Sequence, residues 1–209
     1  GSVRDALLGR LGNDLDFTTP ARPEVVKEIL DEWAETVWDT GIDFGTVSAA
    51  YKGQQIEITT FRSDSYDGQS RNPEVVYGDT LEGDLVRRDF KANAMAIELL
   101  ADASFKFHDP LHGLQDIADR VLDTPDKPEI SFHDDPLRML RAARFASQLE
   151  FRVADRVVEA MRDMAGEIQR ITVERVQVEL DKLICGTAPW DGIDPVSYTH
   201  LRAHETKAN

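Results

Sequence analysis

Cysteine is nearly absent from the 209-residue chain, which contains a single one, Cys185. One cysteine excludes an intramolecular disulfide and any zinc site made of several cysteines. Because Cys185 follows Leu183 and Ile184 on a predicted apolar helix face, we expect a buried thiol that takes no part in chemistry.

Long apolar runs and an excess of basic residues are missing as well. No stretch reaches the roughly 18 residues of a membrane span, and no signal-peptide pattern opens the chain, so we expect a cytoplasmic protein. The 24 Lys and Arg are outnumbered by 39 Asp and Glu, which gives a net charge of −15. This balance argues against a broad basic surface for nucleic acid. If the substrate is RNA, we expect most of the RNA-binding surface to lie outside this sequence.

Neither end of the chain has the pattern of a complete domain. Gly1 and Ser2 lead straight into a predicted helix, so we expect a truncated N-terminus. Residues 196–209 lack an amphipathic period and hold His200 and His204, two of the five histidines. We expect residues 189–209 to be a non-native tail.

The first 115 residues have the mixed pattern of an α+β domain. Residues 44–62 alternate β-branched and polar side chains around Lys52 and Gly53, which is typical of a hairpin. Around this hairpin the sequence predicts a helix at 3–10 with Ser2 as N-cap, a strand within 12–19, a helix at 23–39, a long loop at 63–83, a helix at 89–100 and a strand at 104–109.

Strand signals stop after about residue 115, and the remainder has the periodicity of helices. These are predicted at 136–149, 153–165 and 173–184. The last helix carries an apolar stripe that we expect to be core, formed by Val173, Val176, Leu180, Leu183 and Ile184. We therefore expect a mixed domain at 1–115 followed by a helical domain at 116–188.

Three acidic residues in two strands suggest a metal site. Asp14 and Asp16 lie one residue apart in a strand, so their side chains share a face. Like charges this close repel unless they are hydrated or share a cation, and carboxylate oxygens suit Mg²⁺. Glu57, between Ile56 and Ile58, is the candidate third carboxylate, which would activate an attacking hydroxyl. The alternative for Asp14 and Asp16 is that they lie at a solvated strand end, and the alternative for Glu57 is that it is an ordinary exposed strand residue.

Two further groups of residues suit a nucleotide. Gly1 and Ser2 open a helix and offer backbone N–H groups to a phosphate, unless Ser2 only caps that helix. Arg88 could neutralise phosphate, while Asp89 and Asn93, four residues apart on the predicted helix, could bind the ribose and its surroundings. The alternative is that Asp89 only caps the helix.

Asp135 and Arg138 suit the recognition of a base. Cytosine and adenine both present an amine donor beside a ring-nitrogen acceptor, whereas uracil and guanine present a carbonyl beside an N–H. A carboxylate next to a guanidinium complements the first pattern and opposes the second, so the pair would select C and A. Asp135 as N-cap, with Pro136 at the first helical position, is a sufficient structural alternative.

Seven stretches of the sequence together resemble the class II tRNA nucleotidyltransferases (CCA-adding enzymes) and bacterial poly(A) polymerases, within the polymerase-beta-like nucleotidyltransferase superfamily. In order, these stretches are GSVRDALLG, DLDFTT, IEITTFR, RRDFKANAMA, DPLHGLQDI, DDPLRMLRAARF and ERVQVEL. The resemblance extends from residue 1 to about residue 186. It implies an α+β nucleotidyltransferase head with a mixed sheet, followed by an all-helical neck that recognises the base.

The resemblance also implies roles for particular residues. Asp14 and Asp16 would bind catalytic Mg²⁺, Glu57 would be the third acid, and Glu174 and Arg175 would brace the neck. The loop at 63–83 matches a flexible family element involved in switching between nucleotides. The implied nucleotide-binding residues are Gly1, Ser2, Arg4, Arg88, Asp89, Asn93, Asp135, Arg138 and Arg141.

The implied activity is addition of CMP and AMP, from CTP and ATP, to the 3′ end of tRNA with release of pyrophosphate. Turnover on tRNA should be poor, because the family's body and tail domains are not part of this chain. An ATP-only poly(A) polymerase or A-adding enzyme is not separated from CCA addition by these residues. A nucleotide-binding module without transfer is disfavoured by the three acids, and an antibiotic-modifying nucleotidyltransferase by the base-reading pair and the neck.

Overall fold

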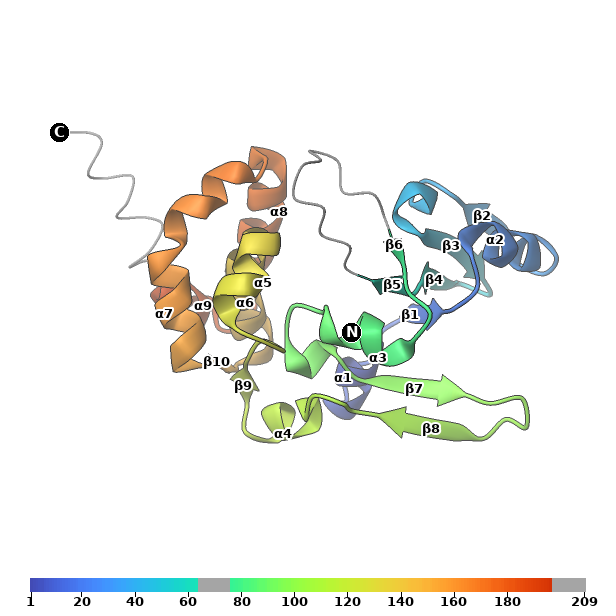
Figure 1. Ribbon diagram of the computed structural model, residues 1–209, viewed down its shortest axis with the longest axis horizontal. Helices are drawn as coiled ribbons and strands as arrows, with labels where there is room; N and C mark the ends of the chain where they lie inside the picture. Colours follow the sequence, from blue (N-terminus) through green and yellow to red (C-terminus); the bar gives the residue numbers. More distant parts are fainter. Residues whose placement is uncertain (64–75, 197–209) are drawn as a thin grey trace. The chain divides into compact units, whose positions relative to one another are not determined.

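The computed structural model describes residues 1–63 and 76–196 and divides into two compact units (Figure 1). The first unit consists of residues 1–88 and 93–110, and the second of residues 89–92 and those from 111 onward. The segment 89–92 therefore belongs with the helical part of the chain. The sequence-based division at residue 115 stays a prediction.

The first unit is built on a four-stranded mixed sheet. Helix α1 (Ser2–Leu7) leads into β1 (Asp14–Thr19), which pairs in parallel with β4 (Gln54–Thr60). The predicted hairpin is confirmed: β3 (Thr46–Tyr51) turns into β4 through Lys52 and Gly53, both with positive φ. With β2 (Thr36–Trp38) at the far edge, the strand order is β1-β4-β3-β2.

Helix α2 (Pro23–Asp31) covers one face of this sheet. Its Val26 and Leu30 pack against Val47 and Ala49 of β3 in a buried cluster. The predicted helix at 23–39 is too long, because residues 36–38 form β2 and pair antiparallel with β3. Thr36, Val37 and Trp38 are residues that favour strands, and the edge of β3 offers them a partner. A short 3₁₀ turn, η1 (Ile42–Phe44), connects β2 to β3.

The predicted loop at 63–83 contains regular structure at both ends. Strands β5 (Arg62–Ser63) and β6 (Val76–Tyr77) pair antiparallel, and helix α3 (Leu81–Val86) follows. Thr80 caps α3 by accepting a hydrogen bond from the Gly83 N–H at 3.2 Å. The rest of that prediction, residues 64–75, lies outside the described residues.

The predicted helix at 89–100 is wrong. A 3₁₀ turn, η2 (Lys91–Asn93), is followed by β7 (Ala96–Leu99), which pairs antiparallel with the predicted strand, β8 (Phe105–His108). Ile97 lies opposite Phe107 and Leu99 opposite Phe105, so period two and cross-strand pairing override the helical propensity of the alanines.

The second unit is mostly helical, as the sequence predicts. Helix α6 (Leu137–Leu149) is its centre, since all its residues except Arg138, Arg141 and Gln148 are buried. The other elements are α4 (Gly113–Ala118), α5 (Pro128–Asp134), α7 (Asp155–Asp163), η3 (Ala165–Arg170), α8 (Val173–Ile184) and α9 (Pro189–Val196). The second unit also contains two short strands that the sequence does not predict, β9 (Val121–Leu122) and β10 (Arg152–Val153), which pair in parallel.

Small residues let α9 pack closely on α6. A Cβ at Gly192 would overlap the Ala143 carbonyl oxygen, and one at Gly186 would overlap the Ser147 hydroxyl. The Ser147 hydroxyl donates to the Leu183 carbonyl at 2.6 Å, and the Ser147 carbonyl accepts from the Ala188 N–H at 2.9 Å. Residues 186–196 are thus part of the fold of the second unit, while residues 197–209 of the predicted tail lie outside the described residues.

The stripe predicted to be core on α8 is mostly at the surface. Leu183 is 1% exposed, but Val173 is 76% and Ile184 61% exposed. The buried thiol predicted at Cys185 is also wrong, because Cys185 lies past the end of α8 and is exposed. In residues 1–63 and 76–196, no helix is long and apolar enough to span a membrane.

Candidate functional site

The predicted acidic residues of the first unit lie on adjacent strands. The parallel register pairs Asp16 of β1 with Glu57 of β4, and residues paired in this way point to the same face. Both side chains are exposed, Asp16 by 53%. Asp14 occupies the first position of β1, opposite Gln55, and its side chain lies outside the described part of the structure. The fold therefore brings Glu57 beside Asp16, as the sequence predicts.

The start of α1 lies against Asp16. The Gly1 amino group donates to Asp16 Oδ2 at 3.0 Å, and the Asp16 N–H donates to Ser2 Oγ at 2.9 Å. Ser2 is therefore not the N-cap that the sequence predicts: it is the first helical residue, and Gly1 occupies the cap position. The Ser2 hydroxyl instead holds the backbone of β1 next to the helix.

The carboxylates of this face suit a hard divalent cation. Asp16 and Glu57 present oxygen ligands in register, the kind that Mg²⁺ prefers. Among the described side chains, no group of three His, Cys, Asp or Glu is close enough to hold a metal by itself. A metal site here would thus need oxygens from Asp14, from the substrate or from water.

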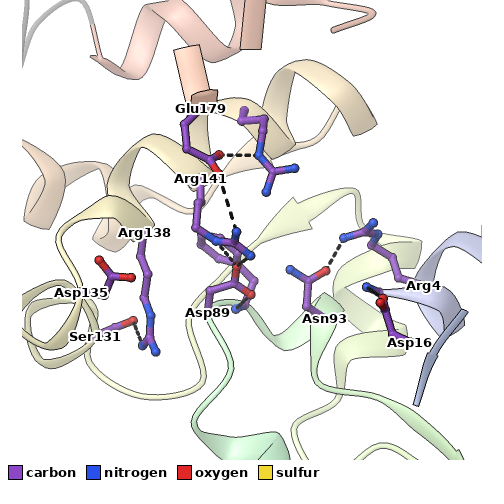
Figure 2. Close-up of polar contacts among 12 residues, drawn as sticks. Arg4, Asp16, Asp89, Asn93, Ser131, Asp135, Arg138, Arg141 and Glu179 are labelled. Carbon is purple, nitrogen blue, oxygen red and sulfur yellow. Dashed lines mark hydrogen bonds and ion pairs between the residues drawn. The ribbon is translucent and has the colours of Figure 1, made fainter. Parts of the chain in front are cut away.

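Arg4 connects the start of the chain to Asn93. Its side chain is only 9% exposed and donates to both carboxylate oxygens of Asp5 at 2.8 Å and to the Asn93 Oδ1 (Figure 2). Arg4 and Asn93, both predicted to bind nucleotide, therefore lie side by side. Here Arg4 orients the Asn93 amide, since the Asn93 oxygen accepts from it.

Arg88, another predicted nucleotide-binding residue, forms an ion pair in the first unit. Its Nη2 donates to Asp84 Oδ2 at 2.6 Å. The Arg88 side chain is 38% exposed, whereas that of Asp84 is 2% exposed. The Arg88 guanidinium is therefore partly exposed while the carboxylate that binds it is buried.

Asp89 is held by Arg141 in the second unit. Arg141 donates to Asp89 Oδ2 from Nε at 2.8 Å and from Nη2 at 2.6 Å, and Asp89 Oδ1 accepts from the Phe90 N–H (Figure 2). The prediction that Asp89 and Asn93 share a helix face is wrong, because no α-helix forms there, Asp89 lies before η2, and the two residues belong to different units. For the same reason Asp89 is not a helix cap.

The contact between Asp89 and Arg141 extends into a buried network that sequence reasoning missed. Glu179 of α8 is 5% exposed; its Oε2 accepts from Arg144 Nε at 2.6 Å, and its Oε1 lies 3.8 Å from Arg141 Nη1. Charges therefore alternate from Asp89 through Arg141 and Glu179 to Arg144. A signal was present in the sequence, since Glu179 precedes the buried Leu183 by one helical turn.

Burial acts on both arginines of this network. It lowers the pKa of the Arg144 guanidinium below its ordinary value, more than the charge of Glu179 raises it. Burial acts on Arg141 in the same direction, but the charge of Asp89 and its hydrogen bonds outweigh it and raise the pKa of Arg141. Losing one member would leave an uncompensated buried charge, which is strongly destabilising.

Asp135 and Arg138 lie next to each other where α5 ends and α6 begins (Figure 2). Arg138 Nη1 donates to Ser131 Oγ at 2.8 Å, and Asp135 Oδ2 accepts from Arg175 at 3.2 Å. Asp135 Oδ1 accepts from the Leu137 N–H at 3.1 Å, so Asp135 does bond the first turn of α6. The cap position itself is Pro136, one residue later than the sequence predicts.

Comparison with known families identifies the class. Residues 1–123 match the family model described as the poly A polymerase head domain, and residues 150–204 match the one described as the probable RNA and SrmB-binding site of polymerase A. These matches define a nucleotidyltransferase head followed by a helical segment, and they confirm the predicted α+β fold. The chain belongs to the poly A polymerase head domain family.

Curated relatives point to one branch of this family. The chain is 41% identical over 187 residues to the CCA-adding enzyme of Lactobacillus helveticus, covering 89% of this chain and 45% of the relative. It is 42% identical over 195 residues to the CCA-adding enzyme of Listeria innocua, covering 93% and 48%. The predicted resemblance is thus confirmed, and the chain spans about half the length of these relatives.

Solved structures agree. The Bacillus stearothermophilus CCA-adding enzyme in complex with CTP superposes with a TM-score of 0.83 at 37% identity, over 96% of this chain and 47% of that one. A tRNA nucleotidyltransferase complexed with a primer tRNA and an incoming ATP analog superposes with a TM-score of 0.79 at 27% identity, over 98% of this chain and 56% of that one. Both are similar to this chain over nearly its whole length.

Proposed function

We propose that the chain is the nucleotide-transfer part of a CCA-adding enzyme, which adds CMP and AMP from CTP and ATP to the 3′ end of tRNA. The carrying observation is the register that sets Asp16 beside Glu57 at the first turn of α1. The relatives named CCA-adding enzymes support the reaction, and the neighbours solved with CTP and with a primer tRNA support the substrates. A tRNA substrate is consistent with a cytoplasmic protein.

In this proposal the first unit performs the transfer. Asp14 and Asp16 would hold Mg²⁺, which when bound would activate the 3′-hydroxyl and stabilise the leaving pyrophosphate. Glu57 accepts the proton of the 3′-hydroxyl, and the 3′-oxygen forms a bond to the α-phosphorus. The bond between the α-phosphorus and the oxygen that bridges it to the β-phosphate breaks, which releases pyrophosphate. Arg88 neutralises phosphate charge as pyrophosphate leaves.

The backbone N–H groups of Gly1 and Ser2 bind phosphate oxygens. Arg4 contributes by holding the Asn93 amide, and both are proposed nucleotide-binding residues. Asn93 then bonds the ribose or the base.

The second unit selects the nucleotide. Asp135 accepts from the exocyclic amine of cytosine or adenine, and Arg138 donates to the ring nitrogen. Arg175, bonded to Asp135, and Ser131, bonded to Arg138, hold the two groups in orientation. Asp89 accepts from ribose hydroxyls while Arg141 fixes its carboxylate.

Nucleotide binding by the 209-residue chain tests this function. We expect isothermal titration with MgCl₂ present to show binding of CTP and ATP, with GTP and UTP weaker by at least roughly tenfold, or about 1.4 kcal/mol. The double variant Asp135→Ala/Arg138→Ala should lose this preference. The matched control is Lys127→Ala/Glu129→Ala, which removes an exposed pair of opposite charges near the start of α5. Equal binding of all four nucleotides by the unmutated chain would overturn the base-reading role.

A poly(A) polymerase is the second candidate, because the matching family model carries that description. The products separate the two functions. A longer protein that contains this chain should be given tRNA lacking its 3′ end and one labelled nucleotide at a time. Incorporation of C before A supports CCA addition, whereas A-only extension supports the poly(A) reaction.

A further inference from the structure

Asp84 is a buried carboxylate that none of the motifs includes. It lies in α3 and is 1% exposed. A carboxylate taken out of water is costly unless it is paired and hydrogen-bonded, so its partners show what it holds in place.

The partners of Asp84 come from two strands and from the segment after α3. Its Oδ2 accepts from Arg88 Nη2 at 2.6 Å and from the Thr18 hydroxyl at 3.5 Å, and its Oδ1 accepts from the Arg62 N–H at 3.2 Å. Thr18 is in β1, Arg62 begins β5, and Arg88 follows α3. One side chain therefore connects the end of α3 to two strands of the first unit.

This connection reaches the acidic strand. Thr18 lies two residues beyond Asp16 in β1, so both side chains point to the same face. Asp84 thus fixes Arg88 relative to the strand that carries Asp16. Because the Arg88 side chain is 38% exposed while the Asp84 side chain is 2% exposed, the pair is anchored at its carboxylate end and presents the guanidinium outward.

We propose that Asp84 is a positioning residue, which fixes the Arg88 guanidinium so that it meets the phosphates of an incoming CTP or ATP. The inference rests on the proposed nucleotide transfer. Asp84 does not itself contact the nucleotide, because almost none of its surface is open to a ligand. A fixed guanidinium binds an oxyanion better than a mobile one, since less rotamer entropy is lost on binding.

A double-mutant cycle on CTP binding tests this inference. Asp84→Asn keeps the shape and one acceptor oxygen but removes the charge that orients Arg88, and Arg88→Ala removes the group that meets the phosphate. We expect each single change to weaken CTP binding roughly tenfold, equivalent to about 1.4 kcal/mol. The double variant should be no weaker than Arg88→Ala alone, because the two residues act as one unit. Glu82→Gln, an exposed acid on α3, should bind like the unmutated chain.

Each outcome decides the question. Additive losses in the cycle, or unchanged binding by Asp84→Asn, overturn the inference while leaving the proposed function intact. If the unmutated chain binds no CTP, the proposed function fails and the inference fails with it. Circular dichroism establishes folding for every variant, and Asp84→Ser, which also removes the charge, replaces Asp84→Asn in the cycle should the latter not fold. A chain that folds with neither would make Asp84 a folding residue only and would overturn the inference too.

Discussion

Single buried charges organise this protein at the scale of the residue. Although the chain carries a net charge of −15, the carboxylates of Asp84, Asp89 and Glu179 are buried and each is bonded to an arginine. An acid removed from water needs such a partner, and guanidinium offers several donors in one plane. The scarce basic residues are therefore used inside the units as well as at the proposed site.

Asp123 links stability to pH. It accepts from Lys91 at 2.6 Å and from Arg156 at 2.7 Å; burial alone would raise the pKa of Asp123, but these hydrogen bonds lower it below its ordinary value. A depressed folded-state pKa gives stability that is present above the unfolded value of about 3.9 and is lost as the pH falls through the folded value.

We expect Asp123→Asn to reduce the free energy of unfolding by about 1–3 kcal/mol at pH 7, because two charge-assisted hydrogen bonds are weakened. The difference from the unmutated chain should shrink as the pH falls below the unfolded value of about 3.9 and through the lower folded value. Urea denaturation at several pH values measures it, with Asp163→Asn at the exposed end of α7 as control. A difference that is the same at every pH would contradict the role assigned to the ionised carboxylate.

At the scale of the element, close packing of α9 on α6 completes the second unit. Gly192 allows this approach because a Cβ there would overlap the Ala143 carbonyl oxygen, a backbone atom that cannot move aside cheaply. The helices therefore depend on the absence of one methyl group.

We expect Gly192→Ala to lower the free energy of unfolding by roughly 1–3 kcal/mol, as overpacking does elsewhere. Gly166→Ala is the matched control, because nothing lies within 4 Å of a Cβ at that position. It should change stability by less than about 1 kcal/mol. Thermal denaturation of both variants checks the prediction, and equal stability of the two would show that α9 does not pack on α6 as described.

At the scale of the whole molecule, charge and length limit what the chain does alone. A protein with a net charge of −15 offers little attraction to the phosphates of RNA. Since the chain spans about half the length of its curated relatives, we propose that the parts of these relatives outside the match supply most of their tRNA contacts.

We therefore expect the 209-residue chain to bind tRNA more weakly than roughly 1 µM at physiological salt, in the range of non-specific binding. CTP binding by the same preparation serves as the control for an intact site. Fluorescence anisotropy with labelled tRNA over a series of salt concentrations measures the affinity. Nanomolar binding that persists at high salt would show that this half carries the RNA-binding surface itself.

The sequence alone determined the features that depend on neighbours along the chain. Period two in β3 and β4 and the Lys52–Gly53 turn give the hairpin. The same alternation sets the face of its own strand to which Asp16, and likewise Glu57, points. The family could also be recognised, because motif order is a property of the sequence. The catalytic and binding roles of these residues stay predictions.

Only the tertiary structure decided the rest, because it depends on partners distant in sequence. Residues 96–99 form a strand because residues 105–108 pair with them. The apolar stripe of α8 is largely exposed, and the buried residues of this helix are Glu179 and Leu183. Asp84 contacts Thr18, which is 66 residues away, and no local sequence pattern encodes this contact. Local propensity contributes tenths of a kcal/mol per residue, whereas burial and pairing contribute more and therefore prevail.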